Sequence, residues 1–528
     1  MLTNHLYLRL LVVIIMIAIA SSCKYYVDHN FRQSYSEINK EIYNEISSSS
    51  FFKVHFKNGD VGVMNSWDLK PSGDTLFGKG SLYNYNRSLI KEGELSFDLE
   101  EIAIIETNEL ANLQSKDKNR MTAITILAAA NLIGDAICLT NPKACFGSCP
   151  TFYLEENDNL HSTRAEGFSS SIAPVLERKD IDALQYVTRS REFHLRMKNE
   201  ALETHVINEV FIEAVLKNVD EKVYADRYNN YYRCKGHLPP AMAKVANRDI
   251  LDKVKAIDEK EYFSVTDSLD LFTREEIYLN FDSMPGQEKG LVLNFRQSLL
   301  TTFLLYSGIS YMGDEFGQIF ANIENNDKSR KYFSLPYDKL GGIKVYIKNP
   351  DKKWVFVEEI KETGPIAKNL NIIRLPSSEN GQATEIKLEL TKGLWRVDHV
   401  GLTTIIEKTE ALKVAVTDIE SINGETYTPY EIAHDDEAYL ISLPGNEFRL
   451  KFELPEIPRT KEFELFLSTK GYYLEWIRKE WLEEKDIAKL RKMMTLDKKT
   501  WRELAIEFKS MEQEMETVFW NSKYTPTQ

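Results

Sequence analysis

The sequence predicts a mainly β, multi-domain protein, and three observations support this fold class. Apolar and polar residues alternate in most segments between Phe51 and Leu467, which is the two-residue period of a half-buried strand. Turn-forming residues such as Asn58-Gly59-Asp60 separate these segments at short intervals. The chain has 528 residues, 43% of them hydrophobic, which is enough for about three globular domains.

The first element is a secretory signal peptide, predicted over residues 1–22. Arg9 precedes an unbroken apolar run from Leu10 to Ala20, and small residues follow it up to Cys23. The run is shorter than the ~20 residues that span a bilayer as a helix. A cysteine directly after the small residues resembles a bacterial lipoprotein signal, which implies cleavage before Cys23 and its acylation, for example with palmitate. A plain signal peptide or a buried helix is the alternative.

The charge of the chain limits its partners. The formal net charge is −14, which gives no general attraction to nucleic acid or to anionic headgroups. We therefore expect no nucleic-acid partner, and we expect the membrane to be reached through the N-terminal lipid. Two or more acyl chains on Cys23 would anchor the protein stably in the cell envelope, as an outer-membrane lipoprotein. Residues 23–50, which end in four serines, are expected to be a polar tether.

A small β barrel is predicted over residues 51–110. Five short alternating segments follow one another there: Phe52–Phe56, Val61–Trp67, Thr75–Lys79, Glu94–Phe97 and Ile102–Glu106. Barrels of this size often bind partners, and a packed spacer is an equally good interpretation. Residues 111–144 are expected to form an apolar helix and a cysteine-rich linker. Asn131 and Asp135 within Met121–Cys138 would be costly inside a bilayer, which favours a buried or surface-lying helix over a spanning one.

Four cysteines remain after Cys23, namely Cys138, Cys145, Cys149 and Cys234. In an exported chain an even number favours disulfide bonds, with three possible connectivities. A metal site is the weaker alternative, because the spacing of the first three cysteines fits no common zinc pattern and the nearest histidine is His161. Free buried thiols are a further possibility. We predict no metal ligands and no cofactor.

The rest of the chain is predicted in four parts. Residues 145–285 are expected to form a β-rich domain, 286–410 a β-sandwich, 411–470 a further β segment, and 471–528 a helical tail. The sandwich contains the clearest strands: Gly290–Phe295, Gly342–Ile347, Trp354–Glu358, Ile372–Leu375, Thr384–Leu390 and Gly393–Val400. Apolar residues at spacings of three and four, from Leu474 to Phe508, predict the helical tail.

Several short motifs carry a resemblance to a family of bacterial lipoproteins of the Bacteroidota type. In order along the chain they are Ser148-Cys149-Pro150-Thr151-Phe152-Tyr153, Ala165-Glu166-Gly167-Phe168, Leu176-Glu177-Arg178-Lys179-Asp180, Asn199-Glu200-Ala201-Leu202-Glu203-Thr204, Gly393-Leu394-Trp395-Arg396-Val397-Asp398 and Gly471-Tyr472-Tyr473-Leu474-Glu475-Trp476. The chain departs from the family pattern at Thr151 and at Ala165-Glu166. The resemblance implies an envelope lipoprotein and brings no activity with it. The strand pattern of 290–407 also resembles a galactose-binding-type jelly roll.

The sequence contains no catalytic motif, and we predict no catalytic residue. Paired carboxylates can hydrolyse glycosides, and Glu166, Glu177, Asp180 and Asp182 lie near turns, where capping or ion pairing is the better interpretation. Asp398-His399 resembles half of an acid–base relay, but in an alternating strand these side chains would point to opposite faces. The three serines that follow Phe168 favour a turn over a nucleophile.

Tyrosines are the predicted binding residues. Tyr228, Tyr231 and Tyr232 form one cluster and Tyr83 and Tyr85 another, and both resemble surfaces that stack on sugars or protein partners. Ordinary half-buried packing is the alternative.

The sequence thus favours a lipid-anchored envelope protein that binds, or is a structural subunit of, an outer-membrane assembly with protein partners. The second hypothesis is a surface protein that binds or processes glycans through the jelly-roll-like module. A third, an envelope peptidase or folding factor, has no positive sign. An exposed aromatic platform with a few polar groups would favour glycans, and a large apolar patch without a pocket would favour assembly.

Overall fold

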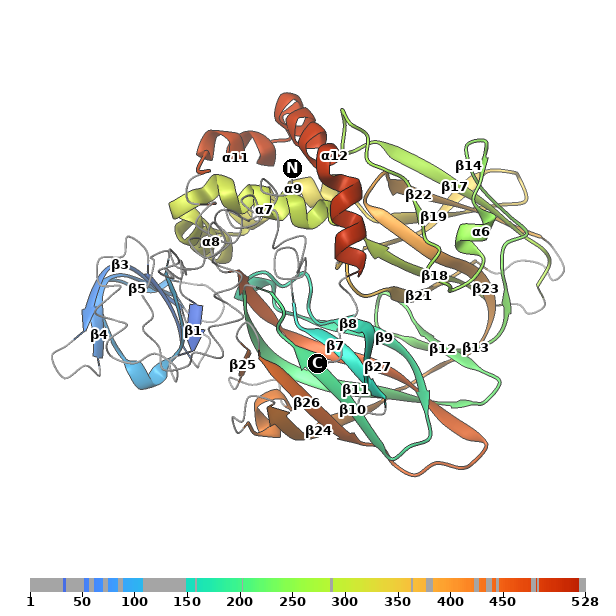
Figure 1. The fold of residues 1–528 in the computed structure, drawn as a ribbon, viewed down its shortest axis with the longest axis horizontal. Coiled ribbons are helices and arrows are strands. Elements are labelled where there is room, and N and C mark those ends of the chain that lie inside the picture. Colours follow the sequence, from blue (N-terminus) through green and yellow to red (C-terminus); the bar gives the residue numbers. More distant parts are fainter. Residues whose placement is uncertain are drawn as a thin grey trace, which may run out of the picture.

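A computed structural model shows a mainly β, multi-domain protein, which confirms the predicted fold class (Figure 1). It describes residues 32–34, 52–56, 61–69, 75–83, 89–107, 149–156, 159–201, 203–284, 288–361, 364–376, 383–421, 427–433, 439–442, 446–475, 481 and 484–521. The predicted signal peptide, most of the tether and the apolar helix of 111–144 lie outside these residues. Within them, no helix is long and apolar enough to cross a membrane.

The N-terminal barrel is a single antiparallel sheet in the order β1-β6-β2-β3-β4-β5. Its strands are β1 (Arg32–Ser34), β2 (Phe52–Phe56), β3 (Val61–Leu69), β4 (Thr75–Tyr83), β5 (Leu89–Asp98) and β6 (Ile102–Thr107). The sheet curls strongly, because Phe56 of β2 packs on Phe97 of β5 with ring centroids 4.7 Å apart although two strands separate them. β1 comes from the segment expected to be only a tether.

A nine-stranded sheet forms the centre of the molecule (Figure 1). Its order is β8-β7-β10-β26-β24-β11-β27-β9, with β25 also paired to β11. The strands are β7 (Thr151–Glu156), β8 (Asn159–Glu166), β9 (Arg178–Thr188), β10 (Glu192–Lys198), β11 (Glu203–Asn218), β24 (Leu412–Ser421), β25 (Leu440–Ser442), β26 (Glu447–Glu453) and β27 (Lys461–Glu475).

This sheet folds around one apolar core, to which nearly every strand contributes alternate residues. Its longest pairing joins β11 to β27, from Glu203 opposite Glu475 to Asn218 opposite Lys461. The sheet is therefore built from two distant parts of the sequence. The predicted β segment 411–470 completes the sheet that residues 151–218 begin.

The sandwich consists of two six-stranded sheets, here called the barrel sheet and the outer sheet. The barrel sheet has the order β13-β12-β21-β18-β23-β16 and closes on itself because β13 also pairs with β23. Its strands are β12 (Lys222–Ala225), β13 (Tyr231–Leu238), β16 (Tyr262–Phe263), β18 (Lys289–Gln297), β21 (Asn369–Arg374) and β23 (Trp395–Thr409).

The outer sheet has the order β15-β14-β17-β22-β19-β20 and is antiparallel. Its strands are β14 (Met242–Val245), β15 (Arg248–Asp249), β17 (Arg274–Phe281), β19 (Ile343–Lys348), β20 (Trp354–Ile360) and β22 (Thr384–Thr391). The two sheets of the sandwich enclose the largest apolar core of the protein. Strands from residue 222 onward belong to the sandwich, so it begins well before the predicted boundary at 286.

Three helices between β18 and β19 were not predicted. They are α7 (Leu300–Met312), α8 (Phe316–Asn325) and α9 (Asp327–Leu340). The short apolar run around Leu300–Leu305 does not distinguish a strand from a buried helix. Asn326 is the usable signal, because its side chain caps α9 by accepting hydrogen bonds from Lys328 N and Ser329 N.

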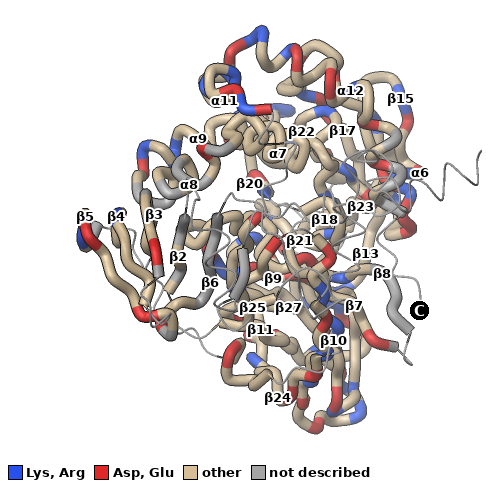
Figure 2. The backbone as a smooth tube through the Cα atoms, turned by 60° about the vertical axis from the view of Figure 1, so that its left-hand side comes forward, with Lys and Arg blue, Asp and Glu red and all other residues tan. Residues whose placement is uncertain are grey.

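The predicted helical tail is shorter than expected. Residues 472–475 continue strand β27, and the helices are α11 (Ile487–Met494) and α12 (Lys498–Asn521). Leu490, Met494, Trp501, Leu504 and Phe508 are buried in the sandwich core, as their helical spacing requires. In Figure 1 these helices lie with α7–α9 above the nine-stranded sheet. Figure 2 shows acidic and basic residues intermixed along the described chain.

Candidate binding cleft between the nine-stranded sheet and the sandwich

A cleft lies where the nine-stranded sheet, the sandwich and helices α7–α9 meet. Its apolar part has a volume of about 420 Å³, which falls in the range of small-ligand sites. The walls are mainly apolar and come from all three parts: Ile172, Leu176 and Tyr473; Leu305, Ile323, Phe333, Tyr337 and Leu340; and Pro365, Leu394 and Trp395.

A second, polar pocket of about 320 Å³ lies next to the apolar one. Arg178 and Lys361 line both pockets, which makes the two pockets neighbours along one cleft. The remaining walls of the polar pocket include charged and amide side chains: Lys179, Asp180, Asp226, Arg227, Asn229, Asn369 and Asn371. The cleft therefore combines an apolar half with a polar half that is rich in cations.

The turn after β8 places Ser169 and Ser170 in the apolar wall. Phe168 has a positive φ of 40°, and Gly167 leaves no room for a side chain, because a Cβ atom there would lie 3.0 Å from Thr469 Oγ1. Asp180 accepts backbone hydrogen bonds from Phe168 and Ser169, which fixes the turn. The serines thus belong to a turn, as the sequence predicted.

The motifs that carry the family resemblance converge on this cleft. Leu176 and Arg178 come from one motif, Leu394 and Trp395 from another, and Tyr473 from a third. These residues are far apart in the sequence, and no local sequence pattern predicts that they line one cavity. The occurrence of these motifs together in one chain is the sequence signal that could have pointed to the cleft.

Polar residues of the other motifs form hydrogen bonds that stabilise the nine-stranded sheet. Glu200 accepts hydrogen bonds from Thr151 Oγ1 at 2.7 Å and from Tyr153 OH at 2.6 Å. The Asn199 side chain donates to Glu203 O and Ser442 O, both at 2.9 Å. These contacts tie β7, β10, β11 and β25 together, so the motif residues serve the scaffold here.

Glu166 connects the nine-stranded sheet to the sandwich. Its Oε2 accepts the backbone N–H groups of Ile366 at 2.6 Å and Ala367 at 2.7 Å. The carboxylate is only 3% exposed and lies against Gly364, where a Cβ atom would come within 2.7 Å of Oε2. Because it accepts two N–H groups, the buried carboxylate of Glu166 links the nine-stranded sheet to the sandwich by hydrogen bonds.

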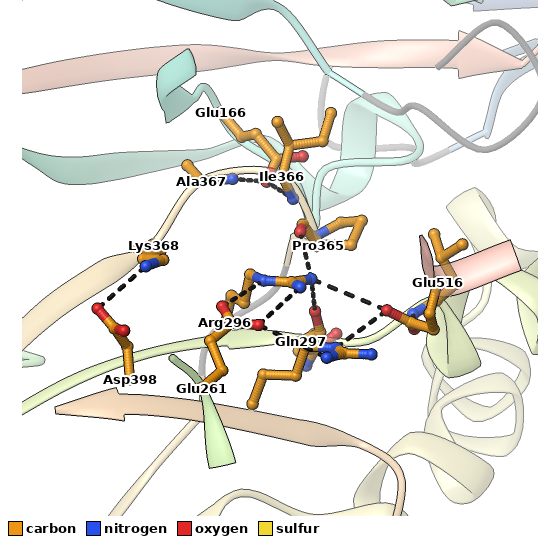
Figure 3. A network of polar contacts seen from close by, with 12 residues as sticks. Glu166, Glu261, Arg296, Gln297, Pro365, Ile366, Ala367, Lys368, Asp398 and Glu516 are labelled. Atoms are coloured by element: carbon orange, nitrogen blue, oxygen red, sulfur yellow. Dashed lines mark hydrogen bonds and ion pairs between the residues drawn. The ribbon is translucent and has the colours of Figure 1, made fainter. Parts of the chain in front are cut away.

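Arg296 holds the same loop from the sandwich side (Figure 3). Its guanidinium donates to Pro365 O at 3.1 Å and forms a two-pronged pair with Glu261 at 2.7 and 2.9 Å. Glu516 of α12 lies 3.9 Å from Arg296 and accepts from Arg396 Nε at 3.0 Å. The guanidinium is 1% exposed, so its charge depends on these carboxylates.

Asp398 and His399 share one face of β23, contrary to the sequence prediction. A bulge places His399 opposite Asn294 but Val397 opposite Phe295, so Asp398 is the extra residue. Val397 and Val400 face the sandwich core, which leaves both polar residues on the other side of the strand. Asp398 pairs with Lys368 at 3.0 Å, and His399 packs on His237 with ring centroids 4.8 Å apart.

Glu177 and Asp182, two of the acidic residues that the sequence places near turns, are partly and fully buried respectively, and they line neither pocket.

Burial changes the titration of His205. Its pKa falls to about 3, so the neutral ring pairs with Glu203 at 2.9 Å. Glu203 in turn accepts the backbone N–H of Cys149. No group of three or more His, Cys, Asp or Glu side chains suited to a metal ion occurs among the described residues.

The predicted tyrosine cluster is split by the structure. Tyr228 is 64% exposed at the polar pocket, stacked on the Arg227 guanidinium at 4.7 Å. Tyr231 and Tyr232 are buried, and their hydroxyls donate to Glu213 and Asp226 respectively. These two side chains therefore do not share an exposed surface with Tyr228, because successive residues of β13 point to opposite faces and both faces are covered. Tyr85 and the side chain of Tyr83 lie outside the described residues.

The structure describes two of the five cysteines for which disulfide bonds or lipidation are predicted. Cys149 and Cys234 are both buried, in the nine-stranded sheet unit and in the barrel sheet respectively, and neither forms a disulfide bond in the structure. Cys138, Cys145 and the predicted lipidation site Cys23 lie outside the described residues.

Comparison with known proteins adds little. The sequence matches no family model and resembles no curated protein. A solved structure, the α-xylosidase of glycoside hydrolase family 31 from Xanthomonas citri, aligns with 78% of this chain at 8% identity and a TM-score of 0.14. The chain spans 35% of that enzyme, and a likeness this weak supports no conclusion about fold or function.

Proposed function

We propose that this chain is a lipid-anchored envelope protein that works by binding, as a subunit of an outer-membrane assembly, and that the cleft is its recognition site. One observation carries the proposal. Three motifs from distant parts of the sequence place Arg178, Trp395 and Tyr473 around one cavity. Recognition sites are commonly concave, largely apolar and found between domains, and this cleft has all three properties.

The surroundings of the cleft support binding over turnover. Several candidate catalytic groups hold the fold: Glu166 accepts two backbone N–H groups, and Asp398 pairs with Lys368. Asp180 lines the polar pocket, where it accepts backbone hydrogen bonds from the turn at Phe168 and Ser169. His399 is nearly fully buried, and its pKa is lowered to about 4 by that burial, so it stays neutral at physiological pH. The side chains of Glu166, Asp398 and His399 line neither pocket.

The test is capture of partners from solubilised outer membranes with the tagged full-length protein, followed by mass spectrometry. Ser170→Trp fills the cleft from a surface turn, and Ile506→Trp places the same side chain at an exposed position of α12. We expect partners to be lost with Ser170→Trp and retained with Ile506→Trp. Equal capture by both variants would contradict the proposal, provided that both melt at the wild-type temperature.

Glycan binding is the second candidate, and an aromatic face of the outer sheet favours it. Tyr278, Tyr346, Trp354 and Phe356 lie on the side opposite the sandwich core, around Lys387, whose amine is 4.6 Å from the centre of the Tyr346 ring. Phe356 is 53% exposed. Aromatic rings beside charged side chains suit stacking on sugars.

Affinity electrophoresis in gels that contain envelope or host polysaccharides tests this second candidate. Retardation of the wild-type protein that is lost in Trp354→Ala with Phe356→Ala, and retained in Tyr228→Ala, would support glycan binding on the outer sheet. Mobility that no polysaccharide changes would exclude it for those polymers.

A further inference from the structure

The two cations shared by both pockets are the least neutralised charges of the cleft. Lys179 pairs with Glu213, and Arg227 lies 3.2 Å from Glu358. Lys361, by contrast, is 3.8 Å from Asp338, and both of these side chains are more than half exposed. Among the described residues, Arg178 has no ion-pair partner within 4 Å, and its charge acts on Asp180 only at longer range. The junction of the two pockets is therefore positive in an acidic protein.

The cavity behind these cations is closed by hydrocarbon and aromatic groups. Leu305, Leu340, Leu394 and Trp395 are almost completely buried by protein contacts, and they still line the cavity. The three charged residues other than Arg178 that border this pocket, Arg330, Asp338 and Lys361, are also partly exposed. An apolar chain placed there gains roughly 0.8 kcal/mol for each CH₂ group that leaves water.

Trp395 lines the pocket with its ring but offers it no donor, because its indole Nε1 is buried and, among the described residues, has no hydrogen-bond partner. The pocket thus combines an apolar lining with a cationic entrance.

We infer that the cleft binds a single-chain anionic amphiphile, with its acyl chain in the apolar pocket and its carboxylate or phosphate head between Arg178 and Lys361. This inference rests on the proposed function, because it names the ligand class of the same cleft. Charge complementarity favours an anionic head over a neutral one, and the lack of charged groups deep in the pocket favours an acyl chain over a polar peptide.

The test uses the full-length protein in isolated membranes and a palmitate analogue that carries a diazirine and an alkyne. After irradiation, labelled peptides are mapped by mass spectrometry. We expect labelling on the segments 300–312 and 333–340, and competition by palmitate but not by its methyl ester. Arg178→Gln and Lys361→Gln should each weaken the competition by palmitate about fivefold, as loss of one solvent-exposed ion pair implies.

Lys235→Gln is the matched control, because Lys235 lines neither pocket and forms an exposed ion pair with Asp220; it should leave palmitate competition unchanged. Labelling confined to other surfaces, or equal competition by palmitate and its methyl ester, would overturn the inference. If labelling fails while Ser170→Trp still abolishes partner capture, the ligand class is wrong and the proposed function stands. If Ser170→Trp abolishes labelling but not capture, the amphiphile site stands and the partner binds elsewhere.

Discussion

Glu166 and Arg296 hold opposite edges of the same short loop. Glu166 accepts the N–H groups of Ile366 and Ala367, and Arg296 donates to the carbonyl oxygen of Pro365. The two side chains belong to different domains, so residues 364–367 are fixed from the nine-stranded sheet and from the sandwich at once. Because Gly364 and Pro365 line the apolar pocket, this pair sets the shape of the cleft.

Glu166→Ala should destabilise the protein by about 2–4 kcal/mol, because it leaves two buried N–H groups without an acceptor. Glu166→Gln should cost only about 1 kcal/mol, since its amide oxygen can still accept. Urea unfolding measures both. Glu456→Gln, at an exposed ion pair, is the control and should change stability by less than about 0.5 kcal/mol. A Glu166→Gln protein that is stable but inactive in cells would point to an enzyme.

Glu261→Gln should cost about 3–5 kcal/mol, because it removes the main counter-charge of a buried guanidinium. Replacing both partners, as Glu261→Gln with Arg296→Met, should recover part of that loss. A double-mutant cycle by denaturant unfolding gives the coupling energy. Additive losses in the cycle would show that the pair contributes little.

The contribution of His205 and His399 to stability should fall as the pH decreases from about 6.5 to 5. Burial lowers the pKa of His205 to about 3 and that of His399 to about 4. Between these values and the unfolded value of about 6.5, the unfolded chain binds more protons, so each of these two histidines contributes up to about 1.4 kcal/mol of loss per pH unit.

Unfolding free energies measured at pH 5, 6, 7 and 8 check this prediction. The values should be nearly equal at pH 7 and 8, where histidine is neutral in both states. His399→Asn should flatten the slope below pH 6.5. An unchanged slope would mean that His399 is accessible to protons in the folded protein.

Tyr231→Phe should destabilise the protein by about 1–2 kcal/mol, because Glu213 loses a buried hydrogen-bond donor. Tyr228→Ala should change stability by less than about 0.5 kcal/mol, because the ring is mostly exposed. Thermal melting distinguishes the two. Any loss of binding in Tyr228→Ala is then a surface effect, whereas loss in the Tyr231 variant follows from unfolding.

Cys149 and Cys234 should resist alkylation in the folded protein and react after unfolding without reductant. Both thiols are buried, and burial raises the pKa of Cys234 to about 12. Peptide mass mapping measures this and also tests the prediction of a disulfide among the four cysteines, for which Cys138 and Cys145 are the remaining candidates. Rapid labelling of Cys234 in the native state would contradict the buried geometry.

Acylation of Cys23 remains a prediction from the sequence. Cys23→Ser should release the chain from membranes or leave it uncut, as membrane fractionation and mass measurement would show. Full retention with normal maturation would disprove the lipid anchor.

The strands were predictable wherever one face is buried. In β22, which lies on the predicted strand Thr384–Leu390, Ile386, Leu388 and Leu390 alternate with charged residues, and the structure buries these three. The bulge at Asp398 was not predictable, since one extra residue leaves no mark in composition. The cleft was also hidden, because it depends on the pairing of β11 with β27, which no local pattern encodes.

Tyr231 and Tyr232 show the same limit. Their sequence context suggested an exposed cluster, because tyrosine is suited to both surfaces and cores. Whether a tyrosine is buried was decided by β23 and β27, which contribute Ile405 and Phe466 to the packing around them. Such partners come from distant parts of the chain and can be identified only once the sheets are known.

The pairing of Glu203 with Glu475 has a consequence for the order in which the chain can fold. β11 is made early in synthesis, yet its main partner, β27, emerges only after the whole sandwich and helices α7–α9. Until then, the apolar face of β11 and its free backbone groups are exposed to other chains, as is usual for slow, non-local β pairing. Folding in vivo should therefore depend on a holding chaperone, and chains truncated before Lys461 should aggregate even though they contain the complete sandwich.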